Sequence, residues 1–212
     1  MALIQIDTNS TPTTPAAGQS KIYIDNVSKK LTTIDDAGRI DTVDDVAGAS
    51  TGGQTGFAAD TYLLGASLLV PRSLPKAGTM YYCCFDMVKT GAGTAAFTIT
   101  IRFGTNGTIA DTSRVSLAFA VGTGVVDTGI FEVWAHFRNV GGAAVLAAQC
   151  RCTHHLAATG LVTTGASGTG VILATSAGFD STVLDSYIGL SVNGGSLFSG
   201  TNTVVESYMR NV

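Results

Sequence analysis

The feature of this chain that most constrains its fold is a repeated alternation of apolar and polar residues that breaks at glycines. It is clearest over residues 99–115, ITIRFGTNGTIADTSRV, which begin as an alternating run, break at two glycines and resume after Asp111. Alternation with a period of two places the apolar side chains on one face of a half-buried strand. A chain built from such segments is expected to fold as layers of strands.

From about residue 57 onward, the sequence contains eight segments that read as strands, separated by glycine-rich turn signals. Many short strands with turns roughly every 8–12 residues indicate a sandwich or a barrel. Residues 113–121 are either a further strand or a short helix, and their alternating apolar residues favour the strand. The eight predicted strands are residues 61–70, 79–89, 95–103, 129–139, 143–155, 169–175, 185–193 and 202–210.

The composition predicts a surface with few charges. Of the 212 residues, 45% are hydrophobic and only 13% are charged, about half of the usual charged share. We therefore expect sizeable interfaces with other copies of the chain; the alternative is a Gly/Thr-rich β domain that is soluble alone. The net charge is −3 and the largest basic cluster is the pair Lys29-Lys30, which does not fit a nucleic-acid binder.

The sequence predicts no membrane insertion and no secretion. No run approaches the roughly 20 apolar residues that cross a bilayer, and the first residues, MALIQID, lack the basic and apolar regions of a secretory signal. The chain is therefore expected to be made in the cytoplasm. In that compartment disulfides are not expected, and we predict buried thiols for Cys83, Cys84, Cys150 and Cys152.

No cofactor, metal or enzymatic activity is predicted. The run Cys150-Arg-Cys-Thr-His154 places two thiols and an imidazole on one strand face, but their spacing of roughly 7 Å suits zinc poorly. Gly48-Ala-Ser-Thr-Gly52 matches the nucleophile-elbow pattern, yet that chemistry needs a strand before the serine and a helix after it. Here the pattern falls in a predicted linker, so we expect no hydrolase.

Two aromatic side chains are candidates for contacts with other molecules. In the predicted strand 129–139, Trp134 lies with the polar residues and not with the apolar face. We favour a subunit interface for it. The alternative is a glycan contact, in which Trp134 and Tyr208 would act beside polar groups.

The N-terminal part is predicted to be an arm and a small β-hairpin. Residues 1–19 are polar with two prolines, and 21–25 and 31–35 are short alternating runs. Residues 44–56 are predicted to be a flexible linker, which divides the chain into an attachment segment 1–43, the linker, and a sandwich domain 57–212. The candidate anchoring residues are Ile4, Ile6, Ile22, Tyr23 and Ile24.

Several segments carry a resemblance to a known family. Residues 99–115, Gly178-Phe-Asp-Ser-Thr-Val183 and Ile188-Gly-Leu-Ser-Val-Asn-Gly194 are similar to the jelly-roll domain of tailed-phage virion proteins. The leader, with PAAGQSKIYID at 15–25 and DAGRI at 36–40, resembles that of phage tail-fibre and head-fibre proteins. The double cysteine and the Cys-x-Cys run depart from the family pattern.

This resemblance implies an all-β, antiparallel jelly-roll sandwich of about eight strands and a place in the virion. It implies a homotrimer that decorates the capsid or forms a head fibre, with the N-terminal arm docked to the major capsid protein or to tail or portal proteins. The alternative is a tail-fibre adhesin that recognises a host surface glycan. Arg102, Asp111 and Asp180 are interpreted as architectural residues that form turns, with Arg102 predicted to pair with Asp111.

Overall fold

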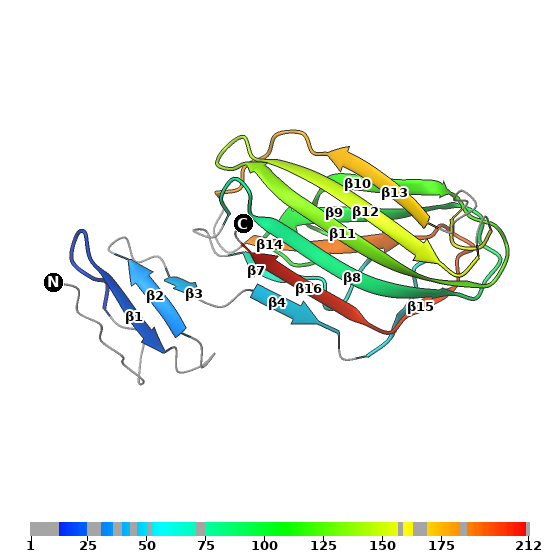
Figure 1. Ribbon diagram of the computed structural model, residues 1–212, viewed down its shortest axis with the longest axis horizontal. Coiled ribbons are helices and arrows are strands. Elements are labelled where there is room, and N and C mark those ends of the chain that lie inside the picture. Colours follow the sequence, from blue (N-terminus) through cyan, green and yellow to red (C-terminus); the bar gives the residue numbers. More distant parts are fainter. Residues whose placement is uncertain are drawn as a thin grey trace.

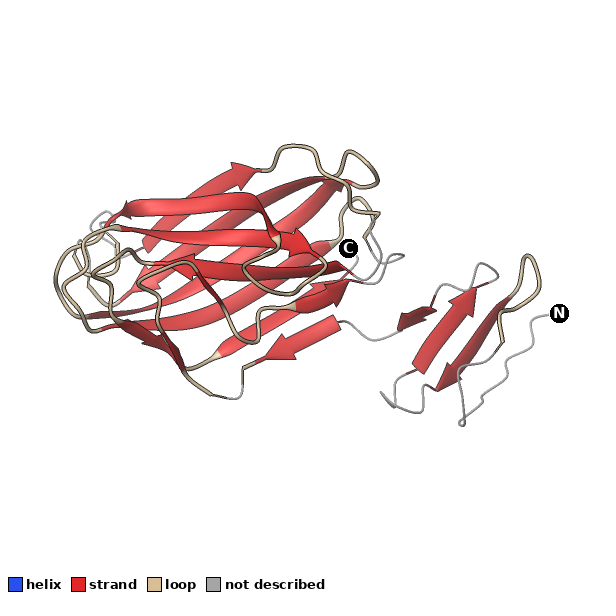
Figure 2. Cartoon of the chain, turned by 180° about the vertical axis from the view of Figure 1, so that it is seen from behind, coloured by secondary structure: helices blue, strands red, loops and turns tan. Residues whose placement is uncertain are grey.

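Strands form the regular structure wherever the computed structural model describes the chain, in residues 13–24, 31–35, 40–42, 46–50, 52–70, 75–156, 159–162, 169–182 and 186–210. These residues contain no helix, and their main body is a sandwich of two antiparallel sheets (Figures 1 and 2). The predicted fold class, an all-β jelly-roll-like sandwich, is confirmed. In the same residues, no helix is long and apolar enough to cross a membrane.

The larger sheet is built around β8, which lies between β11 on one side and β16 and β15 on the other. Beyond β11 follow β12 and β13, and beyond β16 and β15 follow β4 and β5. The bounds of its eight strands in the described chain are β4 Val46–Ala49, β5 Gln54–Thr55, β8 Met80–Lys89, β11 Asp127–Asn139, β12 Val145–His154, β13 Thr169–Thr175, β15 Gly200–Asn202 and β16 Val205–Arg210.

The smaller sheet has the order β10-β9-β14, with β6 and β7 both paired to the far edge of β14. Residues 113–121 are a strand, as their alternation favours, whereas the predicted strand 61–70 is two short strands separated by a turn. The bounds are β6 Thr61–Tyr62, β7 Leu68–Val70, β9 Ala96–Gly104, β10 Thr112–Val121 and β14 Ser186–Asn193.

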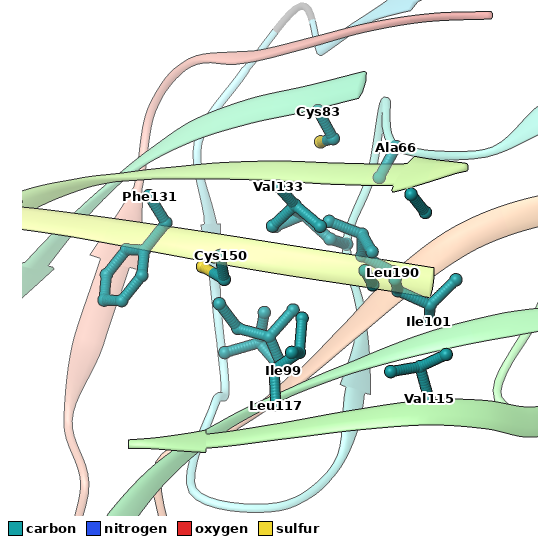
Figure 3. Packing of buried hydrophobic residues seen from close by; sticks show 14 of the residues in the cluster. Ala66, Cys83, Ile99, Ile101, Val115, Leu117, Phe131, Val133, Cys150 and Leu190 are labelled. Carbon is teal, nitrogen blue, oxygen red and sulfur yellow. The ribbon is translucent and has the colours of Figure 1, made fainter. Parts of the chain in front are cut away.

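The core lies between the two sheets and is made by the alternate residues that the pattern predicts to face inward. Figure 3 shows Ile99, Ile101, Leu117 and Leu190 of the smaller sheet gathered against residues such as Val133 of the larger sheet. Complete burial of each such side chain contributes roughly 1.5–3 kcal/mol. Burial along both sheets is therefore the main force that holds the sandwich together.

Aromatic rings and thiols complete this core. Phe131 stacks between Phe85 and Phe97, with ring centroids 5.1 and 4.6 Å away. The four cysteines are free, and Cys83, Cys150 and Cys152 are fully buried, as predicted. Cys84 differs: it is half-buried on the outer face of β8, because its neighbour in sequence occupies the inner face.

The predicted flexible linker 44–56 is wrong at two short segments, which form strands. Val46–Ala49 pairs with β16 and Gln54–Thr55 pairs with β15, so this segment forms the edge of the larger sheet. The physical reason is close packing: a Cβ atom at Gly48 would lie 3.0 Å from the Gly65 carbonyl oxygen and 3.0 Å from Ser207 Oγ. The small residues of this segment suggest a linker in the sequence, but in the fold they are required by the close approach to Gly65 and Ser207.

The N-terminal unit is a three-stranded antiparallel sheet of β1 Ser20–Ile24, β2 Leu31–Asp35 and β3 Ile40–Thr42, one strand more than the predicted hairpin. Residues 13–19 are tied to it, because Lys21 Nζ donates a hydrogen bond to the Thr13 carbonyl oxygen at 2.9 Å. Tyr23 and Ile34 are buried at 2% and 3% exposure. Figure 1 shows this sheet as a unit ahead of β4.

Candidate functional site

Three aromatic side chains form one row across the outer face of the larger sheet. The strand register places Tyr82 of β8 opposite Trp134 of β11 on one side and opposite Tyr208 of β16 on the other. The ring centroid of Tyr82 lies 5.5 Å from that of Trp134 and 4.9 Å from that of Tyr208. All three side chains are half-buried. We call Tyr82, Trp134 and Tyr208 the aromatic strip.

The row continues beyond the aromatic strip on both sides. Trp134 pairs with Gln149 of β12, which pairs with Leu173 of β13, and Tyr208 pairs with Ala47 of β4. Leu173 is 73% exposed. A ridge with an aromatic centre and uncharged ends therefore crosses six strands, because every strand contributes one outward residue at the same level of the register.

Two carboxylates border the aromatic strip: Glu132 of β11 and Glu206 of β16 both lie opposite Cys84 of β8. Tyr82 Oη donates a hydrogen bond to Glu132 Oε1 at 3.4 Å. Arg151 Nε lies 4.0 Å from Glu132 Oε2, and the two side chains are 52% and 30% exposed. Such an exposed pair contributes less than about 1 kcal/mol, so its groups are available to a ligand at little cost.

On the opposite border, cationic groups approach the aromatic strip. The guanidinium carbon of Arg210 lies 5.8 Å from the centre of the Tyr208 ring, within the range of a cation–π contact. His136 of β11 lies at the same level of the register, since it and Arg210 both pair with Met80. The aromatic strip thus has Glu132 and Glu206 on one side and Arg210 and His136 on the other.

The titratable groups of this surface are hydrogen-bonding groups and not nucleophiles. Burial raises the pKa of the Tyr82 phenol, and the nearby Cys84 and Glu132 raise it further. Burial also raises the pKa of the Cys84 thiol. Both groups are therefore protonated at neutral pH, and the surface is suited to stacking and hydrogen bonding.

The structure brings together two of the predicted contact residues and adds one that sequence reasoning missed. Trp134 and Tyr208 are distant in sequence but share one row, and Tyr82 connects them. Residues 79–88, TMYYCCFDMV, are largely apolar at both odd and even positions, so the sequence alone does not single out Tyr82. The alternation of side chains along the strand could have identified Tyr82, because Tyr82 lies on the same face as Asp86. An aspartate cannot point into the core without a partner, so that face must be the outer one.

The predicted architectural residues lie at the ends of the smaller sheet. Arg102 contacts Asp111 through the backbone and not through the carboxylate: its Nη1 donates to the Asp111 carbonyl oxygen at 2.7 Å, and its ion pair is with Asp60. The Asp111 carboxylate accepts hydrogen bonds from the amides of Asn106 and Gly107, both at 2.8 Å. Asp180 Oδ1 accepts from the Thr182 amide at 2.8 Å and from its hydroxyl at 2.7 Å.

The candidate anchoring residues are only partly within the described chain. Ile4 and Ile6 lie outside the described residues. Ile22 is half-buried in β1, and Ile24 ends that strand. Tyr23 is buried within the small sheet, so its ring stabilises that sheet. Anchoring through this group stays a prediction.

A second set of titratable groups is enclosed in the sandwich at the loop after β10. His154 Nδ1 and Asp127 Oδ2 are 2.6 Å apart, and neither side chain is exposed. Lys89 Nζ donates to the Gly160 carbonyl oxygen at 3.1 Å and is also buried. These contacts hold loops together and offer no access to a ligand. The described residues contain no group of His, Cys, Asp or Glu that could hold a metal ion.

Comparison with known proteins gives similarity of structure only. No family model and no curated protein matches the chain. A lectin from Bauhinia forficata in complex with GalNAc is 12% identical with a TM-score of 0.36, covering 79% of this chain and 99% of that one. The CBM2 module of the evolved Dit of Lactobacillus casei BL23 phage J-1 is 10% identical with a TM-score of 0.36, covering 80% and 99%. The lectin UEA-II complexed with galactose is 9% identical with a TM-score of 0.39, covering 85% and 90%.

Proposed function

We propose that this protein is a structural, non-enzymatic component of a tailed-phage virion whose sandwich binds a carbohydrate of the host surface through the aromatic strip. The observation that carries the binding function is the row of Tyr82, Trp134 and Tyr208 across three neighbouring strands. The virion assignment is supported by the sequence resemblance of the leader and of the sandwich segments.

The chemistry of the aromatic strip suits a sugar chain. A pyranose ring presents an apolar face of C–H groups and a rim of hydroxyls, and half-buried aromatic rings offer rigid apolar surface at low entropic cost. The bordering Glu132 and Glu206 accept hydrogen bonds from hydroxyls, and Arg151 and Arg210 donate them. The row lies on an open sheet face, so an extended polysaccharide fits it better than a small enclosed ligand.

In this proposal residues 1–43 attach the chain to the particle, through the major capsid protein or through tail or portal proteins, and the sandwich is the outer module. The chain is then made in the host cytoplasm and located in the virion. A homotrimer accounts for the low charge content, because each copy would shield flanks of two others.

A second candidate function, capsid decoration or a head fibre without glycan binding, is favoured by one observation. Exposed aliphatic side chains lie on the same face of the larger sheet as the aromatic strip: Ile130 is 51% exposed, Val171 59% and Leu173 73%. An apolar surface of this kind also fits contact with a neighbouring subunit. In that case the aromatic strip would be an interface between copies of the chain.

Binding to an array of bacterial surface polysaccharides tests the proposal. The wild-type protein is expected to bind at least one polysaccharide, and Trp134→Ala should weaken that binding roughly tenfold or more. Tyr187→Ala is the matched control, because Tyr187 is a half-buried tyrosine of β14 in the smaller sheet. Equal binding by the wild type and Trp134→Ala would contradict the proposal, as would an array without any bound polysaccharide.

The fluorescence of Trp134 separates glycan binding from subunit contact, because this residue is the only tryptophan of the chain. If the aromatic strip is a ligand site, the emission maximum should not change when the protein is diluted, and it should shift when a bound polysaccharide is added. A red shift on dilution, together with loss of the oligomer in Trp134→Ala, would instead assign the aromatic strip to the subunit interface.

A further inference from the structure

A polar pocket of about 170 Å³ lies at the end of the sandwich where β9 leads into β10. Its lining includes Asn106, Asp111 and Arg114 from this connection, and Asp180 and Ser186 from the segment that leads into β14. It contains no residue of the aromatic strip. Its volume is below the roughly 300 Å³ of sites for drug-sized ligands, so it suits a single small group or one sugar unit.

Arg114 enters this pocket because of an irregularity in β10. Ser113 pairs with Arg102 and Val115 pairs with Ile101, so Arg114 is one extra residue on its strand and has no partner on β9. Bulges of this kind redirect a side chain and are frequent beside functional sites. The guanidinium carbon of Arg114 consequently lies 4.6 Å from the centre of the Phe179 ring.

The guanidinium group of Arg114 has an unused capacity for hydrogen bonding. Its Nε is buried, and among the described residues it has no hydrogen-bond acceptor. A buried donor without a partner is destabilising, and more so when it is charged. Burial also lowers the pKa of this group. A guanidinium group is a planar set of donors that can bind a carboxylate through two parallel hydrogen bonds.

The acids of the pocket are engaged elsewhere. The Asp111 carboxylate accepts the amides of Asn106 and Gly107, and Asp180 accepts two hydrogen bonds from Thr182. Each of these carboxylates stabilises its own loop.

The wall formed by the β9–β10 connection is held in place before any ligand binds. Arg102 Nη1 donates to the carbonyl oxygens of Ile109 and Asp111 at 3.0 and 2.7 Å. Gly107 has a φ of +64°, which favours glycine, and a Cβ atom at Gly104 would overlap the Asp111 carboxylate. The pocket is therefore built by the fold and does not depend on closure around its ligand.

We propose that this pocket binds a carboxylate-bearing sugar of the uronic acid type, with the carboxylate on the guanidinium of Arg114 and the sugar hydroxyls toward the polar lining. The size of the pocket and its mixture of donors and acceptors fit one such unit. This site is distinct from the aromatic strip and goes beyond the proposed function.

The test uses D-glucuronate as the probe and D-glucose as its uncharged counterpart, with the full-length protein followed by NMR. The Nε–Hε signal of Arg114 should shift on addition of glucuronate and not on addition of glucose. Arg114→Gln should weaken glucuronate binding roughly tenfold or more, whereas Trp134→Ala should leave it unchanged. An Arg114 signal that stays constant in the wild type, or equal binding of glucose, would overturn the proposal.

Asp180→Asn separates a carboxylate ligand from a neutral one. Asparagine retains an oxygen that can accept the hydrogen bonds of Thr182, but it removes a negative charge from the pocket lining. Glucuronate should therefore bind more tightly to this variant by a few-fold. Weaker binding would mean that Asp180 accepts hydrogen bonds from the ligand, and would overturn the assignment to a carboxylate. A loss of binding by Trp134→Ala at the array with retained glucuronate binding would distinguish the two sites.

Discussion

Replacement of Asp127 should be among the most destabilising single changes in the sandwich. Its carboxylate is completely buried and lies 2.6 Å from His154 Nδ1. It also accepts hydrogen bonds from the backbone amides of Thr128 at 2.9 Å, Leu156 at 3.2 Å and Leu161 at 2.9 Å. Asp127→Ala leaves these donors without an acceptor, and the hydrogen bond of the Leu161 amide is a buried one.

The expected magnitude follows from these contacts. Removing one partner of a buried, hydrogen-bonded polar pair costs about 3–5 kcal/mol, and each orphaned amide contributes to that cost. For a domain of this size, about 1 kcal/mol lowers Tm by roughly 2–4 °C, which predicts a decrease of roughly 6–20 °C. Asp127→Asn should be milder, since one oxygen is retained for Thr128 and Leu156.

Denaturant unfolding, combined with hydrogen exchange, measures this effect. The amides of Leu156 and Leu161 should lose protection first, because Asp127 is their acceptor. Glu206→Gln is the control: its side chain is exposed on β16, so it should change the free energy of unfolding by less than about 0.5 kcal/mol. A loss below about 1 kcal/mol for Asp127→Ala would refute the view that this carboxylate holds the loops together.

Three further changes test other parts of the structure. Burial raises the pKa of Asp86, but hydrogen bonds from Thr203 and Val204 outweigh this effect and lower the pKa overall. The stability that the Asp86 carboxylate contributes is therefore present above its ordinary pKa and should be lost as pH falls. Acid unfolding of Asp86→Asn should accordingly depend less on pH than that of the wild type. Burial raises the pKa of Cys152 to about 12. The stability that the neutral thiol contributes should therefore be lost as pH rises above 9.0, the ordinary pKa of a thiol. Cys152→Ala should make the free energy of unfolding less dependent on pH in the alkaline range. Gly104→Ala should destabilise the pocket wall by about 1–3 kcal/mol, because the added methyl overlaps the Asp111 carboxylate, measurable by denaturant unfolding; an unchanged midpoint would contradict the close contact.

Strands with a local sequence signal could be predicted, whereas a short strand defined by a distant partner could not. Residues 169–175 form β13 with the bounds predicted from the sequence, because a short run of apolar residues that follows a glycine-rich turn signal is recognisable locally. The strand Val46–Ala49 was missed because its partner is β16, at the other end of the chain, and its small residues serve packing. A long-range pairing of a glycine-containing segment leaves no local pattern.

The two candidate binding surfaces show the same limit. Alternation identified the outward position of Trp134, but its alignment with Tyr208 depends on the register of both strands with β8. The position of Arg114 depends on a bulge, and a single extra residue cannot be recognised from an alternating pattern that resumes at Val115. Sequence reasoning can therefore identify faces of strands, whereas sites assembled across strands require the register.

The distribution of charge supports the assignment of the larger sheet as the binding face. In a chain with 13% charged residues, some charges serve the architecture, as in the ion pair of Arg102 with Asp60. The outer face of the larger sheet instead keeps several charged side chains exposed or half-exposed around the aromatic strip, namely Glu132, Arg138, Arg151, Glu206 and Arg210. In the described chain, Arg102 and Arg114 are the only charged residues on the strands of the smaller sheet. Arg102 forms an ion pair with Asp60, and Arg114 lines the pocket. Scarce charges are thus concentrated where hydrogen bonds to a ligand would be made, which supports the proposal that this face recognises the ligand.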